Sequence, residues 1–161
     1  YDRGHVAAVL PYDPIRDRIV LVRQFRIGAS EAGFPAWQTE AIAGMIDPDE
    51  TPEQVAIREA REEADLEITA LEPIAHYLSS PGASSESVRL FCGRTDSADA
   101  GGVHGLDEEH EDIAVVAYDA DDIPTLLADP GVANGLTVIA LQWLLANRSR
   151  LRQAWRDEAT E

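Results

Sequence analysis

Hydrophobic and polar positions divide the first half of the chain into short β-like runs. Residues 5–12 and 18–25 are rich in apolar and β-branched side chains, and the turn-forming segment 13–17 separates them. This pattern predicts a β-hairpin. A loop is expected next, because the chain is interrupted there by Gly28, Gly33 and Pro35. Further strands are predicted at 37–43, 68–77, 88–93 and 113–118.

A helix is predicted at 52–64. Thr51 suits the N-cap, Pro52 suits the first helical position, and Glu53 suits the positive end of the helix dipole. The same helix has small apolar side chains on one face, which we expect to pack on a sheet: Ala56, Ile57, Ala60 and Ala64.

The C-terminal part of the chain is predicted to be mainly helical. Asp121 or Asp122 can cap a short helix that ends before Asp129, and segment 136–155 carries apolar residues at helical spacing. Strands combined with one central helix and terminal helices indicate an α+β fold with a mixed sheet. Because the 161 residues contain no repeat or linker, we expect one domain, 1–161.

Composition excludes several classes of protein. No stretch approaches the roughly 18 consecutive apolar residues of a membrane span, and the N-terminus lacks the pattern of a signal peptide. The single cysteine, Cys92, precludes an internal disulfide, which suits a reducing cytoplasm. Cys92 lies in an apolar run, so we expect a small buried side chain rather than a nucleophile. A cytoplasmic protein without a membrane partner is predicted.

The formal net charge of −17 narrows the possible partners. Such a surface repels a phosphate backbone, and the sequence has no basic stripe, so nucleic acids are excluded. The charge fits an ordinary acidic protein, and it equally fits one whose acids include a metal site. If the substrate is itself a polyphosphate, cations must bridge it to the protein.

The predicted helix 52–64 gathers acids on one face. Glu59 lies three residues before Glu62 and four before Glu63, so all three carboxylates share a side. Like charges at this spacing destabilise a helix by roughly 0.2–0.5 kcal/mol per pair, whereas a hard cation such as Mg²⁺ reverses the effect. Arg58, four residues before Glu62, can orient that carboxylate. For the glutamates alone, a solvated charged helix is the alternative interpretation.

The segment from Gly44 to Leu66 as a whole resembles the Nudix box. The matching positions are Gly44, Glu50, Arg58, Glu59, Glu62, Glu63 and Leu66, with five residues between the first two and seven between Glu50 and Arg58. The chain departs from the box at Asp65, where the family has Gly. That position follows the helix, where a left-handed conformation is common, and Asp tolerates this conformation less well than Gly. We therefore expect a less stable helix end with the chemistry retained.

The resemblance implies an α/β/α sandwich-like Nudix fold and a pyrophosphohydrolase that uses Mg²⁺ or Mn²⁺. Carried over to this chain, the implied metal ligands are Glu59, Glu62, Glu63 and the carbonyl of Ala43. Glu62 and Arg58 belong to the implied catalytic group, Glu50 is an auxiliary acid near the metal, and Gly44 begins the box.

Three stretches outside the box resemble bacterial ADP-ribose pyrophosphatases: 23–26 with Glu40, 77–86, and 134–143. Arg26 is the candidate for gripping a phosphate, because a guanidinium fork matches phosphate oxygens; a surface arginine is the alternative. Glu40 is expected to contact the terminal part of the substrate, or else to be a solvated strand carboxylate. The Ser-Pro-Gly loop implies substrate contacts from Gly82 and Ser85, with an ordinary turn as the alternative.

The acidic loop 105–112 is, without the resemblance, a solvated loop. The resemblance implies that Glu109 is the catalytic base and Glu111 a carboxylate near the metal. His110 is expected to point to solvent. Repulsion among the acids of this loop would raise a carboxylate pKa toward useful base strength.

The implied activity is hydrolysis of ADP-ribose, a small nucleoside-diphosphate sugar, to AMP and ribose 5-phosphate. The alternatives are a GDP-mannose or broader nucleoside-diphosphate-sugar pyrophosphatase and, from another class, a sensor domain that binds ADP-ribose without cleaving it. A sensor is expected to lose box carboxylates, and all are present here. Members of this kind usually form a homodimer by exchanging an N-terminal β-rich domain, which we expect to be absent from this chain.

Overall fold

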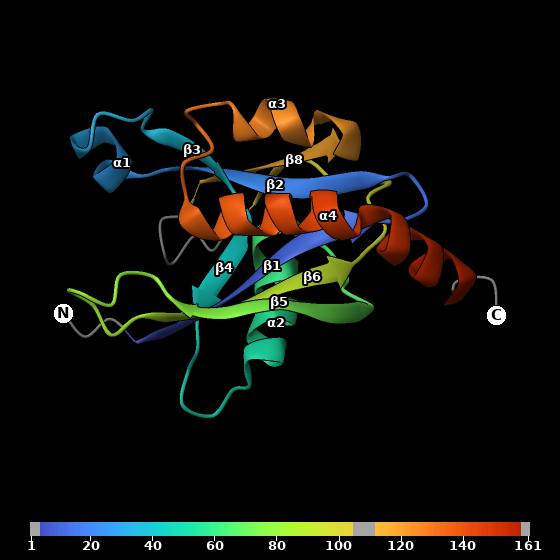
Figure 1. The fold of residues 1–161 in the computed structure, drawn as a ribbon, viewed down its shortest axis with the longest axis horizontal. Coiled ribbons are helices and arrows are strands. Elements are labelled where there is room, and N and C mark those ends of the chain that lie inside the picture. The colour runs from blue at the N-terminus through green and yellow to red at the C-terminus, as the bar shows by residue number, and fades with distance from the viewer. Residues whose placement is uncertain (1–3, 105–111, 159–161) are drawn as a thin grey trace.

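The computed structural model describes residues 4–104 and 112–158, and it consists of a sheet between two helical layers (Figure 1). Helix α2 (Pro52–Ala64) covers one face, and α3 (Ile123–Leu127) and α4 (Gly135–Glu158) cover the other. The expected α+β class and sandwich architecture are confirmed. The strands are β1 (His5–Asp13), β2 (Arg18–Phe25), β3 (Trp37–Glu40), β4 (Ile42–Met45), β5 (Ala70–Leu78), β6 (Ser87–Arg94), β7 (Val103–His104) and β8 (Ile113–Asp119).

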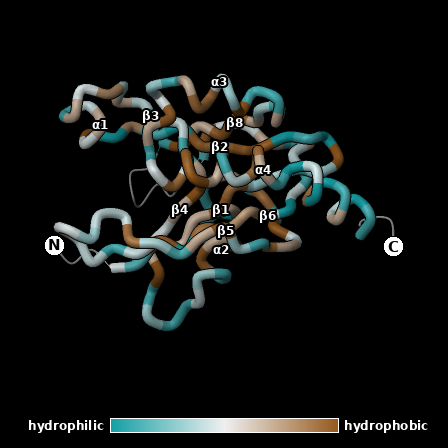
Figure 2. The backbone as a smooth tube through the Cα atoms, viewed as in Figure 1, coloured by the Kyte–Doolittle hydropathy of each residue, from teal (hydrophilic) through white to brown (hydrophobic). Residues whose placement is uncertain are grey.

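Alternation along β1 explains the two layers. Successive side chains of a strand point to opposite faces of a sheet. Leu10 and Tyr12 are fully buried in the core that contains Leu141 of α4, whereas Val9 between them is buried in the core that contains Ala60 of α2. Hydrophobic residues follow the central strands, and the C-terminal end of α4 is hydrophilic (Figure 2). Two separate cores therefore hold the helices on the sheet.

The sheet is mixed, as predicted. Its strand order is β5-β6-β1-β2-β8-β7, with β3 paired to β2 and β4 paired to β1. β1 runs parallel to β6 and antiparallel to β2 and β4. β1 and β2 form the predicted hairpin, and their register joins Tyr12 to Ile19 and Asp13 to Arg18, next to the turn. Farther from the turn, each of these two strands has another partner.

The single strand predicted at 37–43 is therefore wrong. In β3, Glu40 pairs with Val22 of β2; in β4, Ala43 pairs with Ala8 of β1. The chain changes partner at Ala41, which is buried. The physical reason is that β1 and β2 separate beyond their hairpin, so one segment fills the gap by pairing first with one strand and then with the other. As a consequence, the candidate site residue Glu40 of β3 is followed closely along the chain by Ala43 and Gly44 of β4.

Other differences from the predictions occur where periodicity is weak. The expected loop contains a short helix, α1 (Ile27–Glu31), which buries no side chain and is held by backbone bonds such as Ser30 N to Arg26 O. The pattern also gives no sign of the two-residue strand β7. Ile57, expected on the packed face of α2, is 45% exposed, because the helix turns Val55 and Ala56 inward instead.

Both ends of α2 behave as predicted. Thr51 Oγ1 accepts from Gln54 N at 3.2 Å, and Gln54 Oε1 accepts from Thr51 N at 2.8 Å, which forms a capping box. Asp65 ends the helix in the left-handed conformation, with a φ of 51°. Local sequence signals thus fix the position of the acidic face in the fold.

Cys92 is fully buried on β6, as expected for a small apolar side chain, and burial raises the pKa of its thiol. Within residues 4–104 and 112–158, none of the helices has the length and apolar character needed to cross a bilayer.

Candidate active site

The acidic face of α2 is organised around one arginine. Arg58 Nη1 donates to Glu59 Oε1 at 2.8 Å and to Glu62 Oε2 at 3.0 Å. The contact with Glu62 is the one expected from the four-residue spacing. Two carboxylates of one helix face therefore converge on a single cationic nitrogen.

Glu50 joins this cluster from the loop before α2. Arg58 donates from Nε to Glu50 Oε1 at 2.9 Å and from Nη2 to Glu50 Oε2 at 3.0 Å. Bidentate pairs of this kind are the strong form of the arginine–carboxylate interaction. These bonds hold the pKa of the Glu50 carboxyl below its usual range, so Glu50 stays ionised.

Gly44 of β4 lies against the carboxyl group of Glu59. A Cβ atom built on Gly44 would overlap the side chain of Glu59, so this close approach requires glycine. The contact brings Glu59 to the backbone of β4, where Ala43 is the neighbouring residue. The strand that carries the implied carbonyl ligand and one implied carboxylate ligand, Glu59, thus meet where α2 packs on β4.

Glu63 is the buried member of the acidic face, with 4% of its surface exposed. Its Oε1 accepts from Gln24 Nε2 of β2 at 3.4 Å. Burying a carboxylate is costly unless nearby positive charge or hydrogen bonds compensate for the lost water. Glu63 is therefore a group whose ionised form a neighbouring cation would stabilise.

In the part of the chain that the structure describes, no three His, Cys, Asp or Glu side chains are arranged to hold a metal ion as they stand. The donor chemistry nevertheless fits a hard cation, which prefers carboxylate and carbonyl oxygens. Glu59 and Glu62 already converge on one positive nitrogen, and Gly44 leaves room for Glu59 beside a strand backbone. A divalent ion would have to take over these oxygens from Arg58.

A pocket of about 610 Å³ adjoins this cluster. Ala43 and Gly44 of β4 line it, and so do Arg26 and Glu40. A smaller pocket of about 240 Å³ shares Arg26, Glu40 and Asn134 with the first. Of the predicted metal residues only Ala43 lines this pocket, together with the predicted substrate residues Arg26 and Glu40; Glu59 adjoins it through its contact with Gly44.

Arg26 and Glu40 contact each other directly. Arg26 donates to Glu40 Oε2 from Nε at 2.9 Å and from Nη2 at 2.6 Å. Glu40 is 3% exposed, so the alternative of a solvated strand carboxylate is wrong. The Arg26 side chain is 47% exposed, so much of it still faces solvent at the pockets.

Asn134 is a residue of this site to which the sequence assigned no role. Its Nδ2 donates to Glu40 Oε1 at 2.9 Å, across 94 positions in the chain. Residue 134 begins a stretch that resembles the pyrophosphatases, but residue type alone gives no signal for a contact over such a separation.

The Ser-Pro-Gly loop takes the form of turns. Ala83 N and Ser84 N both donate to Ser80 O, at 3.0 and 2.9 Å. Gly82 and Ser85 are exposed and do not line the 610 Å³ pocket, whereas Glu86, the last residue of the motif, does. Glu86 is therefore a second residue that the sequence reasoning left without a role.

The two residues expected from the acidic loop, Glu109 and Glu111, lie outside the described residues, as does His110.

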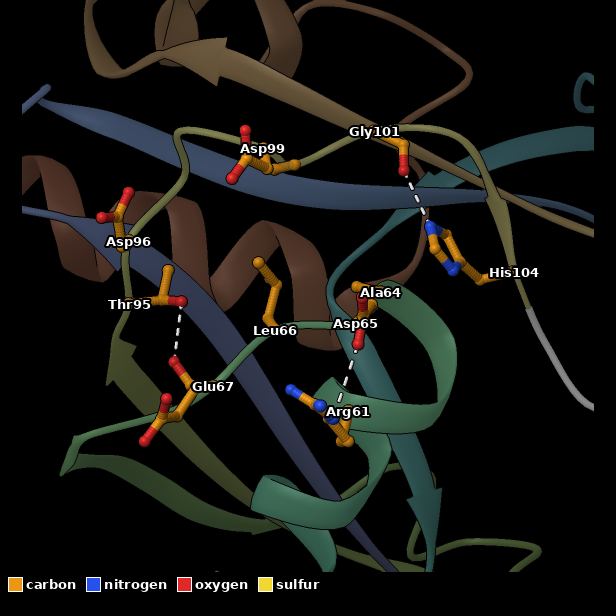
Figure 3. Close-up of a pocket in the computed structure, with 11 residues that line it drawn as sticks. Arg61, Ala64, Asp65, Leu66, Glu67, Thr95, Asp96, Asp99, Gly101 and His104 are labelled. Atoms are coloured by element: carbon orange, nitrogen blue, oxygen red, sulfur yellow. Dashed lines mark hydrogen bonds and ion pairs between the residues drawn. The ribbon is translucent and has the colours of Figure 1, made fainter.

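A separate pocket of about 330 Å³ lies at the C-terminal end of α2 (Figure 3). Arg61 and Asp65 form an ion pair at its edge at 3.4 Å, and His104 bonds to the carbonyl of Gly101 at 2.7 Å. None of the predicted site residues that the structure describes lines it. Arg26, Glu40, Ala43 and Gly44 line the 610 Å³ pocket instead, and the predicted carboxylates lie on the acidic face of α2.

Comparisons with known proteins identify the family of this chain. The NUDIX domain model matches residues 2–138. The chain is 40% identical over 155 residues to the ADP-ribose pyrophosphatase of Escherichia coli strain K12, which covers 96% of this chain and 74% of that protein. It is 35% identical over 149 residues to the GDP-mannose pyrophosphatase of Cronobacter sakazakii, covering 89% and 75%. A crystal structure of an ADP compounds hydrolase superposes with a TM-score of 0.74 at 21% identity, covering 92% of this chain and 75% of that one.

Proposed function

This chain belongs to the Nudix family of hydrolases, and from that membership we propose that it cleaves the pyrophosphate bond of ADP-ribose to give AMP and ribose 5-phosphate. The observation that carries the proposal is the place of Gly44, which contacts the carboxyl group of Glu59 and also lines the 610 Å³ pocket. A diphosphate that reaches Gly44 in this pocket would approach the carboxylate of Glu59.

The divalent metal that Nudix hydrolases generally use is proposed to be Mg²⁺ or Mn²⁺. Its ligands are proposed to be Glu59, Glu62, Glu63, Glu111 and the carbonyl of Ala43. When bound, the ion neutralises the pyrophosphate and polarises phosphorus.

The remaining roles are assigned to the chain's own groups. Glu109 takes the proton of the attacking water as general base. Arg26 binds a phosphate oxygen, and Arg58 with Glu50 orients Glu59 and Glu62. Gly82 and Ser85 approach the substrate from their loop, and Glu40 acts at its terminal part. Hydrolysis of a diphosphate then depends mainly on positioning and charge stabilisation.

GDP-mannose is the second candidate substrate, because relatives named GDP-mannose pyrophosphatase match 89% of this chain. The ADP-ribose pyrophosphatases match more of it, at higher identity. A sensor domain without activity is disfavoured, because every charged position of the box is present.

A homodimer in the cytoplasm completes the proposal. Phe25 and Trp37 contact edge to face, with ring centroids 6.0 Å apart, and both are exposed together with Ile27 and Phe34. Exposed apolar patches of this kind mark interaction sites. Light scattering after size exclusion would measure the oligomeric state, and the single buried Cys92 suits a reducing compartment.

The experiment is a substrate panel of ADP-ribose, GDP-mannose and ADP-glucose with Mg²⁺, Mn²⁺ or EDTA, scored by release of nucleoside monophosphate. We expect ADP-ribose to have the highest kcat/KM and EDTA to abolish turnover. Glu63→Gln should lower kcat by about 10²-fold. Glu53→Gln, an exposed acid in the first turn of the same helix, is the matched control and should retain activity.

Different measurements distinguish the proposed roles of Glu109 and Glu111. Glu109→Gln should lower kcat and leave metal affinity nearly intact, whereas Glu111→Gln should weaken metal binding. Full activity in EDTA, or a Glu63→Gln enzyme as active as wild type, would refute the metal site. Wild-type turnover by Glu109→Gln with loss in His110→Ala would move the base.

A further inference from the structure

The segment before α4 lies along β3 and is bound to it by several hydrogen bonds. Thr39 N donates to Gly131 O at 2.7 Å, and Ala133 N donates to Gln38 Oε1 at 3.0 Å. Ala41 N donates to Thr137 Oγ1 at 2.9 Å. The start of the longest helix is thus held against the strand that carries Glu40.

Asn134 is fixed by this helix start. Its main-chain oxygen accepts from Thr137 N and Val138 N, both at 3.0 Å, and its Oδ1 accepts from Leu136 N at 3.2 Å. These are the bonds of an N-cap residue. Since α4 is anchored by fully buried Leu141 and Leu144, the amide group of Asn134 has a well-defined place.

The remaining donor of Asn134, Nδ2, binds Glu40 Oε1 at 2.9 Å. Arg26 binds the other oxygen, Oε2. A carboxylate that is 3% exposed needs such partners, because it has lost nearly all contact with water. Glu40 is therefore held on one side by a rigid helix end, and it holds Arg26 on the other.

Arg26 needs this support. A half-exposed arginine has many rotamers, and fixing the side chain costs roughly 2 kcal/mol of conformational entropy. Glu40 engages the Nε–Nη2 edge of the guanidinium, which restricts both its position and its plane. The same three residues, Arg26, Glu40 and Asn134, form the wall common to the two pockets.

We propose that Asn134 is a positioning residue for substrate binding, which acts through Glu40 to preset the Arg26 guanidinium for the diphosphate of a nucleoside-diphosphate sugar at the junction of the two pockets. This proposal rests on the proposed function for the nature of the substrate, but the geometry of the three side chains can be tested without it.

The test variant is Asn134→Ser. Serine is a good N-cap residue, so it keeps an oxygen for α4 but has no donor that reaches Glu40. We expect KM for ADP-ribose in saturating Mg²⁺ to rise about 10-fold, with kcat changed less than about twofold, as for a lost hydrogen bond to a charged group that binds substrate before and during reaction.

The matched control is Thr137→Val. It is nearly isosteric, lies in the same first turn, and removes the bond to Ala41 N, another bond between α4 and this strand segment. If Asn134 acted only by holding the helix in place, the two variants would raise KM alike, and the proposal would be overturned. In a Glu40→Gln background, Asn134→Ser should add little further effect, because the two changes interrupt one chain of contacts.

A second readout uses no substrate. The exchange rate of the Arg26 Nε proton, followed by ¹⁵N NMR, should be similar in wild type and Thr137→Val and at least about fivefold faster in Asn134→Ser, because a bonded proton is protected. Unchanged exchange in Asn134→Ser would overturn the proposal. If wild type hydrolysed none of the panel, the proposed function would fail, while this measurement would still decide whether Asn134 fixes Arg26.

Discussion

Arg58 binds Glu50 through two parallel bonds, from Nε at 2.9 Å and from Nη2 at 3.0 Å, and so turns its remaining nitrogen toward Glu59 and Glu62. Glu59 and Glu62 are also two of the proposed metal ligands, so the guanidinium contacts the carboxylates that would bind the ion. In the metal-free protein it relieves their mutual repulsion. On the proposed ligation, we expect binding of a metal to compete with the contacts of Arg58 with Glu59 and Glu62.

Replacing Arg58 should separate its structural role from its competition with metal. Arg58→Gln leaves the acids of the cluster without their counter-ion, so the metal-free protein should lose about 2 kcal/mol of unfolding free energy. The Tm gain on adding Mg²⁺ should be larger than in wild type, because binding then relieves more repulsion. kcat should still fall, since Glu62 loses its orienting partner.

The control is Arg61→Gln, which removes the same charge from the same helix at an exposed position. It should change neither the unfolding free energy of the metal-free protein nor the Tm gain on adding Mg²⁺ appreciably. A smaller Mg²⁺ response in Arg58→Gln than in Arg61→Gln would contradict the competition and leave Arg58 with an orienting role alone.

Gly44→Ala tests the close approach between β4 and the acidic helix. The added methyl group would displace the carboxylate of Glu59. We expect metal affinity, measured by calorimetric titration, to fall at least about 10-fold, the scale of a disturbed ligand environment. The metal-free Tm should change little, because a glutamate side chain can rotate away. At Gly135 an added Cβ meets open space, so Gly135→Ala is the control and should bind metal normally.

Asp65 offers a stabilising change. Its left-handed backbone, with a φ of 51°, and its negative charge at the negative end of α2 are both unfavourable. Asp65→Gly should raise the free energy of unfolding by about 0.5–1 kcal/mol in urea titrations, with kcat unchanged. Asp65→Asn removes only the charge, so the difference between the variants reports the backbone strain. Loss of activity in Asp65→Gly would mean that the helix end also positions the chemistry.

Asp17 should make stability depend on acid pH. Burial alone would raise its pKa, but hydrogen bonds from Arg148 and Tyr12 lower it overall. A carboxyl with a depressed folded-state pKa stabilises fully above its unfolded value of about 3.9, and this contribution is lost as pH falls further. Asp17→Asn should cost about 2 kcal/mol at pH 7 and much less at pH 2–3, by chemical denaturation.

The control for this pH effect is Asp121→Asn, because Asp121 also pairs with Arg148 but is 86% exposed. It should cost little at any pH. An equal pH slope in the Asp17→Asn variant and wild type would assign the acid lability to other groups, such as Asp13, whose pKa is also lowered.

The sequence predicts those parts of the molecule that depend on neighbours along the chain. The hairpin of β1 and β2, the N-cap at Thr51 and the left-handed Asp65 all follow from local residue types, and the structure has each of them. The acidic face of α2 follows from helical spacing. The positions of Glu109 and Glu111 are outside the described residues, so their roles stay predictions.

Features that depend on distant partners could not be predicted. The break at Ala41 arises because β1 and β2 separate, and no residue between 37 and 45 encodes this locally. The bond from Asn134 to Glu40 joins residues 94 positions apart, and only the assembled sheet brings them together. Ile57 was assigned to the wrong face because small apolar residues on both sides of a helix allow more than one rotation.

The change of partner at Ala41 also determines how this enzyme could be re-engineered. β3 is locked in register to β2 and β4 to β1, so a one-residue insertion between Glu40 and Gly44 would turn one set of side chains to the wrong face of the sheet. Grafts from a related enzyme should therefore leave the length of 37–45 unchanged. The exchangeable unit is residues 37–40 together with 131–137, which contact each other through three hydrogen bonds. Such a chimera would take Glu40, Asn134 and their neighbours in the substrate pocket from the related enzyme, and it would keep its own acidic helix α2.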